Sequence, residues 1–172
     1  MVELENPLAR ENRAACIVAR LGLEPGMKVL DAGCGPGRLT VPLARAVGRT
    51  GEVVALDAQR AMLDITLEKT RWEGLDNILL FVARLGEDSL PAVSFDREVM
   101  VTVLGEIPDR AAALKSLYGA LKPDGILSIT ETVFDPHYQR RSTVKRLGKT
   151  AGFRVRAVFG NWLAYTLHLQ KP

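Results

Sequence analysis

The sequence predicts an α/β fold built on a doubly wound, mostly parallel β-sheet. Five short apolar segments alternate with segments whose apolar residues recur at helical spacing. Uninterrupted apolar strands are typical of parallel sheets that are covered on both faces. The last apolar region alternates instead, around Gly160-Asn161, which indicates that an antiparallel hairpin closes the sheet.

The elements follow one another regularly along the chain. The predicted strands are residues 28–33, 53–57, 78–83, 97–104 and 126–132, followed by the hairpin at 153–170. The predicted helices are residues 8–21, 38–47, 61–73, 109–121 and 141–150, because their apolar residues share one face. The third strand, ILLFVA, has no polar face. Trp162 and Tyr165 are expected to pack in the core and the hairpin rather than to stack on a nucleic-acid base.

The length and composition indicate one globular domain. The chain has 172 residues, of which 47% are hydrophobic and 25% charged, the balance of a folded protein. We expect a single domain, 1–172, in which an N-terminal helix within residues 1–24 precedes a Rossmann-like core at 25–172.

The chain shows no signal for export or for a membrane span. Its apolar runs, such as 78–83, are far shorter than the ~18 residues of a transmembrane helix, and its first residues include acids where a signal peptide is apolar. A cytoplasmic location is expected. Cys16 and Cys34 lack the paired spacing of a zinc site, so neither a metal nor a disulfide framework is expected.

Basic residues concentrate late in a chain whose formal net charge is only +3: Arg140, Arg141, Lys145, Arg146, Lys149, Arg154 and Arg156. These side chains form either a solvated helix face or a surface that meets anions such as RNA phosphates or lipid headgroups. DNA is not an expected partner.

The segment VLDAGCGPGRLT lies where a doubly wound sheet binds its ligand, between the first strand and the next helix. Gly33, Gly35 and Gly37 leave the backbone of this turn open to close approach by a nucleotide-like cofactor. A dinucleotide fingerprint would need glycine or alanine at position 38, which is Arg38.

Two acids near this turn suggest the kind of cofactor. Asp57 ends the second strand, where a carboxylate can accept hydrogen bonds from both ribose hydroxyls. Asp31 ends the first strand and suits a ligand with a cationic amine and a sulfonium better than one with a pyrophosphate. These features favour S-adenosylmethionine over NAD.

Four motifs in this order, VLDAGCGPG, VVALD, FDREVMVTVL and ALKPDGILSITE, resemble those of class I S-adenosylmethionine-dependent methyltransferases. The similarity is to the group that includes ubiquinone/menaquinone C-methyltransferase-like proteins (methyltransferase types 11 and 25), and it extends from Pro25 to the C-terminus. The resemblance implies seven strands in the order 3-2-1-4-5-7-6, with strand 7 antiparallel and helices on both faces.

The resemblance also implies a set of cofactor-binding residues: Asp31, Gly33, Cys34, Gly35, Gly37, Asp57, Ala58, Met62 and Thr102. Asp31 and the glycine loop would hold the methionine portion, Asp57 the ribose, and Ala58 with Met62 the adenine surroundings. Related proteins often carry an aspartate after the third strand, but here Arg84 comes early and Glu87 and Asp88 come late. Backbone amides are therefore expected to contact the adenine.

Methyl transfer from a sulfonium is an in-line displacement that mainly needs alignment and exclusion of water. A general base would help with some acceptors, and the candidates at the substrate side are Glu106, Glu131, His137 and Tyr138. The acceptor is expected to be a small molecule or a lipid-like compound. RNA or protein methylation, a non-catalytic cofactor-binding subunit and, distantly, NAD-dependent oxidoreduction are alternatives. Since little of the chain can cover the cleft, the cleft is expected either to stay open or to be covered by a second copy or a partner subunit.

Overall fold

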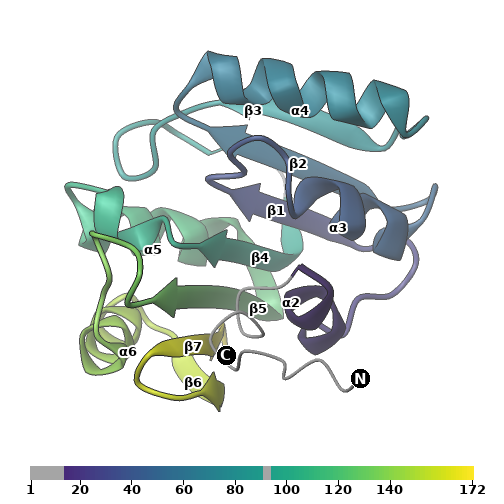
Figure 1. Cartoon of the computed structure of the whole chain (residues 1–172). Helices are drawn as coiled ribbons and strands as arrows, with labels where there is room; N and C mark the ends of the chain where they lie inside the picture. Colours follow the sequence, from purple (N-terminus) through teal and green to yellow (C-terminus); the bar gives the residue numbers. More distant parts are fainter. Residues whose placement is uncertain (1–13, 91–93) are drawn as a thin grey trace, which may run out of the picture.

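The structure is a computed structural model that describes residues 14–90 and 94–172. Its seven strands form one sheet in the order β3-β2-β1-β4-β5-β7-β6 (Figure 1). The strands are β1 (Lys28–Ala32), β2 (Glu52–Asp57), β3 (Ile78–Val82), β4 (Phe95–Val101), β5 (Leu121–Thr132), β6 (Arg154–Gly160) and β7 (Ala164–Gln170). Strands β1 to β5 are parallel, whereas β7 is antiparallel to both β5 and β6. The predicted fold class and strand order are confirmed.

Helices cover both faces of the sheet (Figure 1). They are α2 (Ala14–Arg20), α3 (Thr40–Val47), α4 (Arg60–Trp72), α5 (Arg110–Ala120) and α6 (Arg141–Thr150). Consecutive residues of β2 point to opposite faces of the sheet. Val53 packs with α2 and α3 on one face, whereas Val54 packs with α5 on the other. Helix α4 lies on the first face, with Leu63 against Ala55. Helix α2 corresponds to the second part of the predicted helix 8–21. The part of that prediction before residue 14 lies outside the described residues.

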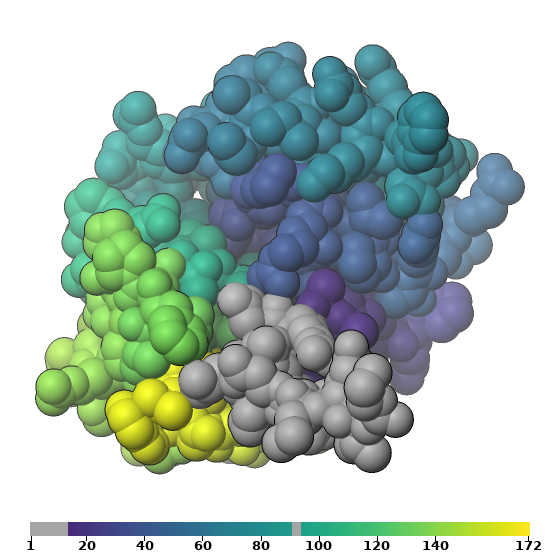
Figure 2. Space-filling model, viewed as in Figure 1, coloured from purple at the N-terminus to yellow at the C-terminus, as the bar shows by residue number. Residues whose placement is uncertain are grey.

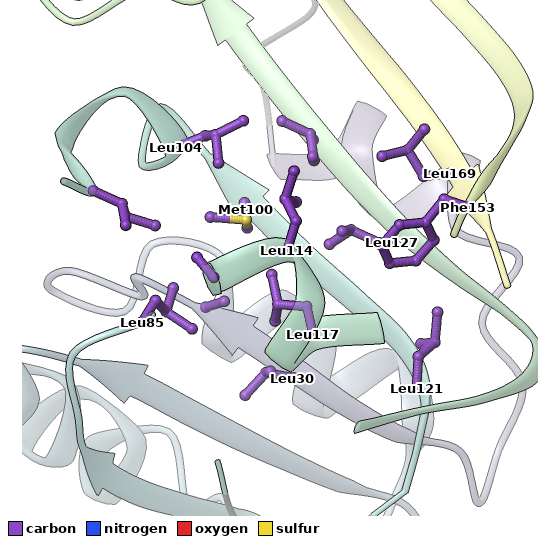
Figure 3. Packing of buried hydrophobic residues seen from close by; sticks show 14 of the residues in the cluster. Leu30, Leu85, Met100, Leu104, Leu114, Leu117, Leu121, Leu127, Phe153 and Leu169 are labelled. Carbon is purple, nitrogen blue, oxygen red and sulfur yellow. The ribbon is translucent and has the colours of Figure 1, made fainter. Parts of the chain in front are cut away.

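The larger core lies between the sheet and the α5–α6 layer (Figure 3). Leu114 and Leu117 of α5 are fully buried and pack in one cluster with Leu30 of β1, Met100 of β4 and Leu127 of β5. Burial of side chains of this size stabilises a fold by roughly 1.5–3 kcal/mol each. This layer fixes the positions of β1 and β4, whose carboxyl ends reach the functional site.

The end of β4 differs from the prediction of residues 97–104. The strand ends at Val101, because Thr102 has a φ of 56° and turns the chain out of the sheet. Residues Leu104–Glu106 then form a 3-10 helix, η1, and Asp109 caps α5 by accepting a hydrogen bond from the amide of Ala112. A positive φ is unfavourable for a β-branched residue, so this turn is held by the surrounding structure.

Three other predictions also need correction. Helix α3 begins at Thr40 rather than residue 38. Strand β5 begins at Leu121 rather than residue 126, and Asp124 within it has a left-handed conformation (φ 60°). Strand β3 is an edge strand, so Leu79 and Val82 remain half exposed although the strand has no polar face. Among the described residues, no helix is long and apolar enough to cross a bilayer.

The hairpin separates the two aromatic residues that were expected to be buried. Tyr165 of β7 is fully buried, and its hydroxyl donates a hydrogen bond to the carbonyl of Gln139. Trp162 is 73% exposed, so the prediction of core packing is wrong for this residue. It lies in the turn between β6 and β7, and a residue in such a turn can project beyond the sheet.

Candidate functional site

A cavity of about 570 Å³ lies at the carboxyl ends of β1, β2, β3 and β4. Its size is in the range of small-molecule sites. Eight of the nine predicted cofactor residues line it: Asp31, Gly33, Cys34, Gly35, Asp57, Ala58, Met62 and Thr102. The structure therefore brings together side chains that are up to 71 positions apart in the sequence.

The glycine loop between β1 and α3 is attached to the neighbouring strands. The amides of Gly33 and Cys34 both donate hydrogen bonds to the carbonyl of Leu56, at 2.8 and 2.9 Å. Gly33 has a φ of 78°, and a Cβ atom there would lie 2.4 Å from Cγ2 of Val103. Only glycine can both adopt this conformation easily and fit against the turn after β4.

The other two glycines have different surroundings. Gly35 has a φ of 52°, and a Cβ atom there would meet nothing within 4 Å, so the loop leaves open space beside it. Gly37 does not line the cavity; a Cβ atom there would lie 2.9 Å from the side chain of Thr66 on α4. Gly37 therefore allows the loop to approach α4 closely.

Asp57 connects the loop to the end of β2. Its Oδ2 accepts a hydrogen bond from the amide of Gly35 at 2.9 Å, and its Oδ1 accepts one from the amide of Gln59 at 2.8 Å. A carboxylate has about four lone-pair sites, so two more hydrogen bonds, such as those from a ribose diol, can still be accommodated. Asp57 is 9% exposed and lines the cavity.

Asp31 is a buried carboxyl group at the end of β1. Burial raises its pKa to about 6, although a hydrogen bond from Thr40 Oγ1 to its Oδ2, at 2.7 Å, and the charge of Arg38 oppose this effect. A cationic ligand group beside it would favour the ionised form. The role of Thr40, which is fully buried, was missed, although it ends the glycine-rich motif.

The thiol of Cys34 is not activated as a nucleophile. Burial and the nearby carboxylates of Asp31 and Asp57 raise its pKa to about 12. A neutral thiol is a weak nucleophile. Cys34 therefore serves as a small wall residue of the cavity.

The turn after β3 forms the opposite wall. Ala83, Arg84, Leu85 and Glu87 line the cavity, while Asp88 accepts a hydrogen bond from the amide of Arg84 at 2.7 Å and lies outside the lining. The apolar contacts of this wall were missed, because an alanine and a leucine after a strand carry no distinctive sequence signal. They are suitable neighbours for the flat surface of a base.

The four substrate-side candidates do not gather at one point. Glu106, in η1, lines the cavity, whereas Glu131, His137 and Tyr138 do not. A Cβ atom on Gly105 would lie only 1.8 Å from the carbonyl oxygen of His137. The connection after β5 therefore packs against the outside of the turn that carries Glu106.

Glu131 is the most unusual of these residues. Its side chain is buried at the end of β5; Oε2 accepts a hydrogen bond from the amide of Gln139 at 3.1 Å, and Oε1 has no partner in the described part of the chain. Burial, reinforced by Asp135 and Glu106, raises the pKa of Glu131 to about 7. This carboxyl group can therefore gain or lose a proton near neutral pH.

The two aromatic candidates after β5 act in the turn itself. The amide of His137 donates a hydrogen bond to Asp135 Oδ1 at 2.7 Å, and its side chain is 56% exposed. The hydroxyl of Tyr138 donates a hydrogen bond to the carbonyl of Trp162 at 2.9 Å. Tyr138 thus links the β5–α6 connection to the hairpin turn.

Comparison with known protein families agrees with this site. The family described as "Methyltransferase domain" matches residues 29–125, which is more than half of the chain and spans the glycine loop, Asp57 and the turn after β4. The chain belongs to the methyltransferase domain family. This confirms the prediction of a class I S-adenosylmethionine-dependent methyltransferase domain, an enzyme family whose methyl donor is S-adenosylmethionine.

Curated relatives of this methyltransferase domain are identical to it at about a third of the aligned positions. The demethylmenaquinone methyltransferase of Staphylococcus aureus is 36% identical over 116 residues, 67% of this chain and 47% of the relative. The ubiquinone/menaquinone biosynthesis C-methyltransferase UbiE of Vibrio vulnificus is 35% identical over 119 residues, 67% of this chain and 46% of the relative. The chain spans about half the length of these relatives.

Solved structures extend the comparison to almost the whole methyltransferase domain. An S-adenosylmethionine-dependent methyltransferase from Aquifex aeolicus has a TM-score of 0.84 at 26% identity, covering 98% of this chain and 95% of the other. The [4+2]-cyclase SpnF has a TM-score of 0.81 at 16% identity, covering 94% of this chain and 80% of the other. The second match shows that the fold alone does not decide the reaction.

Proposed function

We propose that this methyltransferase domain transfers a methyl group from S-adenosylmethionine to a small, lipid-like organic acceptor. One observation carries the proposal: Asp31, the glycine loop and Asp57 converge on a single cavity of about 570 Å³. The curated relatives named for menaquinone and ubiquinone biosynthesis support a small-molecule acceptor.

The residues of the cavity fit the parts of this cofactor. Asp57 would accept hydrogen bonds from the ribose, Asp31 would face the cationic amine, and the open side of Gly35 would admit the methionine portion. Met62 and Leu85 supply apolar surface for the base. When bound, S-adenosylmethionine supplies an activated methyl group on a sulfonium.

Two carboxyl groups, one on the cavity wall and one behind it, would have different tasks on the substrate side. Glu106 lines the cavity and would orient the acceptor or remove its proton. Glu131 lies behind this turn, buried, with its pKa raised to about 7 by burial. It would act as a positioning residue, because its Oε2 accepts a hydrogen bond from the amide of Gln139, in the connection that packs against the turn of Glu106.

Calorimetry with S-adenosylmethionine, S-adenosylhomocysteine and NAD tests the cofactor. Both adenosyl compounds are expected to bind and NAD is not. Binding of NAD without either adenosyl compound would contradict the proposal.

A methyl-transfer assay with labelled cofactor tests the acceptor. Demethylated quinones and other small aromatic compounds, RNA and protein fractions would be offered separately. Labelling of the small-molecule pool is expected, and labelling confined to RNA or protein would reject the proposed acceptor class. Cofactor binding without transfer to any pool would instead support a non-catalytic subunit.

Substituting Glu106 and Glu131 by glutamine separates their roles. Both changes should lower turnover while leaving the affinity for S-adenosylhomocysteine within about twofold, since neither residue is proposed to hold the cofactor. Glu131→Gln is also expected to shift the pH dependence of turnover. A loss of cofactor affinity in either variant would place that residue in the cofactor site instead.

A further inference from the structure

Charge is divided unevenly along this chain. All 20 acidic residues precede Pro136, and residues 136–172 hold eight lysines or arginines and no aspartate or glutamate. The structure gathers these residues at one end of the sheet, in α6, β6 and β7, opposite the β3–α4 end (Figure 1). Residues 136–172 therefore carry a net positive charge, and the two acids just before them, Glu131 and Asp135, have largely buried side chains.

Two large apolar side chains project at the same end. Phe134, after β5, is 72% exposed, and Trp162, between β6 and β7, is 73% exposed. Their turns are joined by a hydrogen bond of 2.9 Å from the amide of Val133 to the carbonyl of Leu163, and by the hydrogen bond from Tyr138 to the carbonyl of Trp162. The two turns therefore lie side by side.

Two arginines adjoin these turns. Arg140 and Arg141 are exposed, and both charges act on the hydroxyl of Tyr138, whose pKa is raised by burial and by Glu131 and lowered by these arginines. Together with Phe134 and Trp162 they make up what we call the aromatic–basic patch. The segment of the chain that contains it is green and yellow in Figure 2.

We propose that the aromatic–basic patch docks this protein on an anionic lipid bilayer. Cations attract anionic headgroups, while tryptophan and phenylalanine settle at the boundary between headgroups and acyl chains. A purely electrostatic partner would account for the arginines but not for two large apolar side chains held at neighbouring turn tips. This inference stands independently of methyl transfer, because binding needs neither cofactor nor acceptor.

Because of where the patch lies, docking would also set the position of the cavity relative to the bilayer. The patch follows the carboxyl end of β5, the same edge of the sheet that carries the cavity. The His137 carbonyl between Phe134 and Arg140 packs on Gly105, next to Glu106. Docking would hold the wall that contains Glu106 near the lipid surface.

Cosedimentation with vesicles tests the proposal on the full chain. The protein should bind vesicles of phosphatidylcholine that contain about 40% phosphatidylglycerol roughly tenfold more tightly than vesicles of pure phosphatidylcholine. This binding should weaken as the salt concentration is raised. Equal binding to both vesicles, or binding to neither, would overturn the proposal.

Paired variants show whether the patch is responsible. Phe134→Ser/Trp162→Ser and, separately, Arg140→Gln/Arg141→Gln should each weaken binding roughly tenfold or more. The matched controls are Trp72→Ser, which removes a tryptophan that is 92% exposed at the end of α4, and Arg49→Gln/Arg71→Gln at the β3–α4 end. Equal losses in the control variants would overturn the assignment to the patch.

Tryptophan fluorescence gives a readout that does not depend on mutational loss. The chain has two tryptophans, so Trp72→Phe leaves only Trp162 and Trp162→Phe leaves only Trp72. Anionic vesicles with brominated acyl chains should quench Trp162 and shift its emission to shorter wavelength, and they should leave Trp72 unchanged. Sedimentation without quenching of Trp162, or tighter patch-dependent binding to an RNA oligonucleotide than to vesicles, would overturn the bilayer as partner.

Discussion

Asp57 combines two tasks in one side chain. Its oxygens hold the glycine loop through the amide of Gly35 and start the turn into α4 through the amide of Gln59. Asp57 also lines the cavity, where its remaining lone pairs would accept hydrogen bonds from the proposed ribose. The residue therefore shapes the site and, in the proposed complex, would also hold the cofactor.

Replacing Asp57 by asparagine should weaken binding of S-adenosylhomocysteine by about 1–3 kcal/mol, because charge-assisted hydrogen bonds are lost. Titration calorimetry measures the change. Asp64→Asn is the matched control, since Asp64 is exposed on α4 and pairs with Arg60 at 2.9 Å. Unchanged affinity in Asp57→Asn would mean that the cofactor binds elsewhere.

Glu131 makes the stability of the protein depend on pH. Burial raises its native pKa from 4.5 to about 7, so the native state binds its proton more tightly than the unfolded state. This contribution to stability is fully present below pH ~4.5 and is lost as the pH rises to about 7.

Glu131→Gln should remove this dependence. Relative to the unmodified protein, the variant should become more stable by up to about 3 kcal/mol between pH 5 and pH 8, because one pKa unit corresponds to ~1.4 kcal/mol. Urea unfolding across this range measures the difference, and Glu68→Gln, at an exposed position of α4, controls for the loss of a surface charge. A difference that stays constant with pH would refute the raised pKa.

At the scale of elements, the site depends on turns that fit against one another. The glycine loop after β1 meets the turn after β4 at Gly33 and Val103, while the connection after β5 meets η1 at His137 and Gly105. Each contact joins the carboxyl ends of strands that are neighbours in the sheet. The cavity wall is therefore built by strand order rather than by any one loop.

Gly33→Ala should destabilise the fold by about 1–3 kcal/mol in urea unfolding, since the new Cβ atom would contact Val103 and the positive φ would be unfavourable. Gly35→Ala separates the two causes: it has a similar φ but open space around it, so it should show only the backbone cost. Combining Gly33→Ala with Val103→Ala should recover part of the loss. Identical losses for Gly33→Ala and Gly35→Ala would rule out the proposed contact.

In the molecule as a whole, the cavity and the basic surface lie at different parts of one sheet. The candidate cofactor cavity lies at the carboxyl ends of β1 to β4, and the aromatic–basic patch lies beyond β5 at the β7–β6 end. Glu106, the proposed acceptor-side residue, follows β4 and so lies between them. This order places the proposed methyl donor and the proposed lipid surface on opposite sides of the acceptor position.

Cofactor binding should stabilise the whole fold. S-adenosylhomocysteine at 100 times its Kd should add about 2.7 kcal/mol and raise Tm by roughly 5–10 °C for a chain of this size. Thermal unfolding measures the shift, with NAD at the same concentration as the control. An equal shift with NAD, or none with S-adenosylhomocysteine, would contradict the assigned cofactor.

Local sequence patterns were sufficient to predict the class of fold and the loop at which a cofactor is expected to bind. Apolar strands, helical spacing and the glycine-rich motif are local patterns, so they can be recognised without knowing which segments meet. They placed Asp31, Gly33, Gly35 and Asp57 correctly on the cavity. Predicted boundaries differ from the structure where backbone conformation overrides apolar character, as at Thr102, whose positive φ ends β4.

Which distant residues lie together became clear only from the packing of the folded chain. The contacts of Gly33 with Val103 and of Gly105 with His137 join segments that no local pattern relates. Strand order and turn geometry place Glu106 on the cavity wall, whereas the other three substrate-side candidates do not line the cavity. They also bury Glu131 behind this wall and leave Trp162 exposed near Phe134. A periodic sequence specifies which face of an element is apolar, but burial depends on the neighbour that packs against that face.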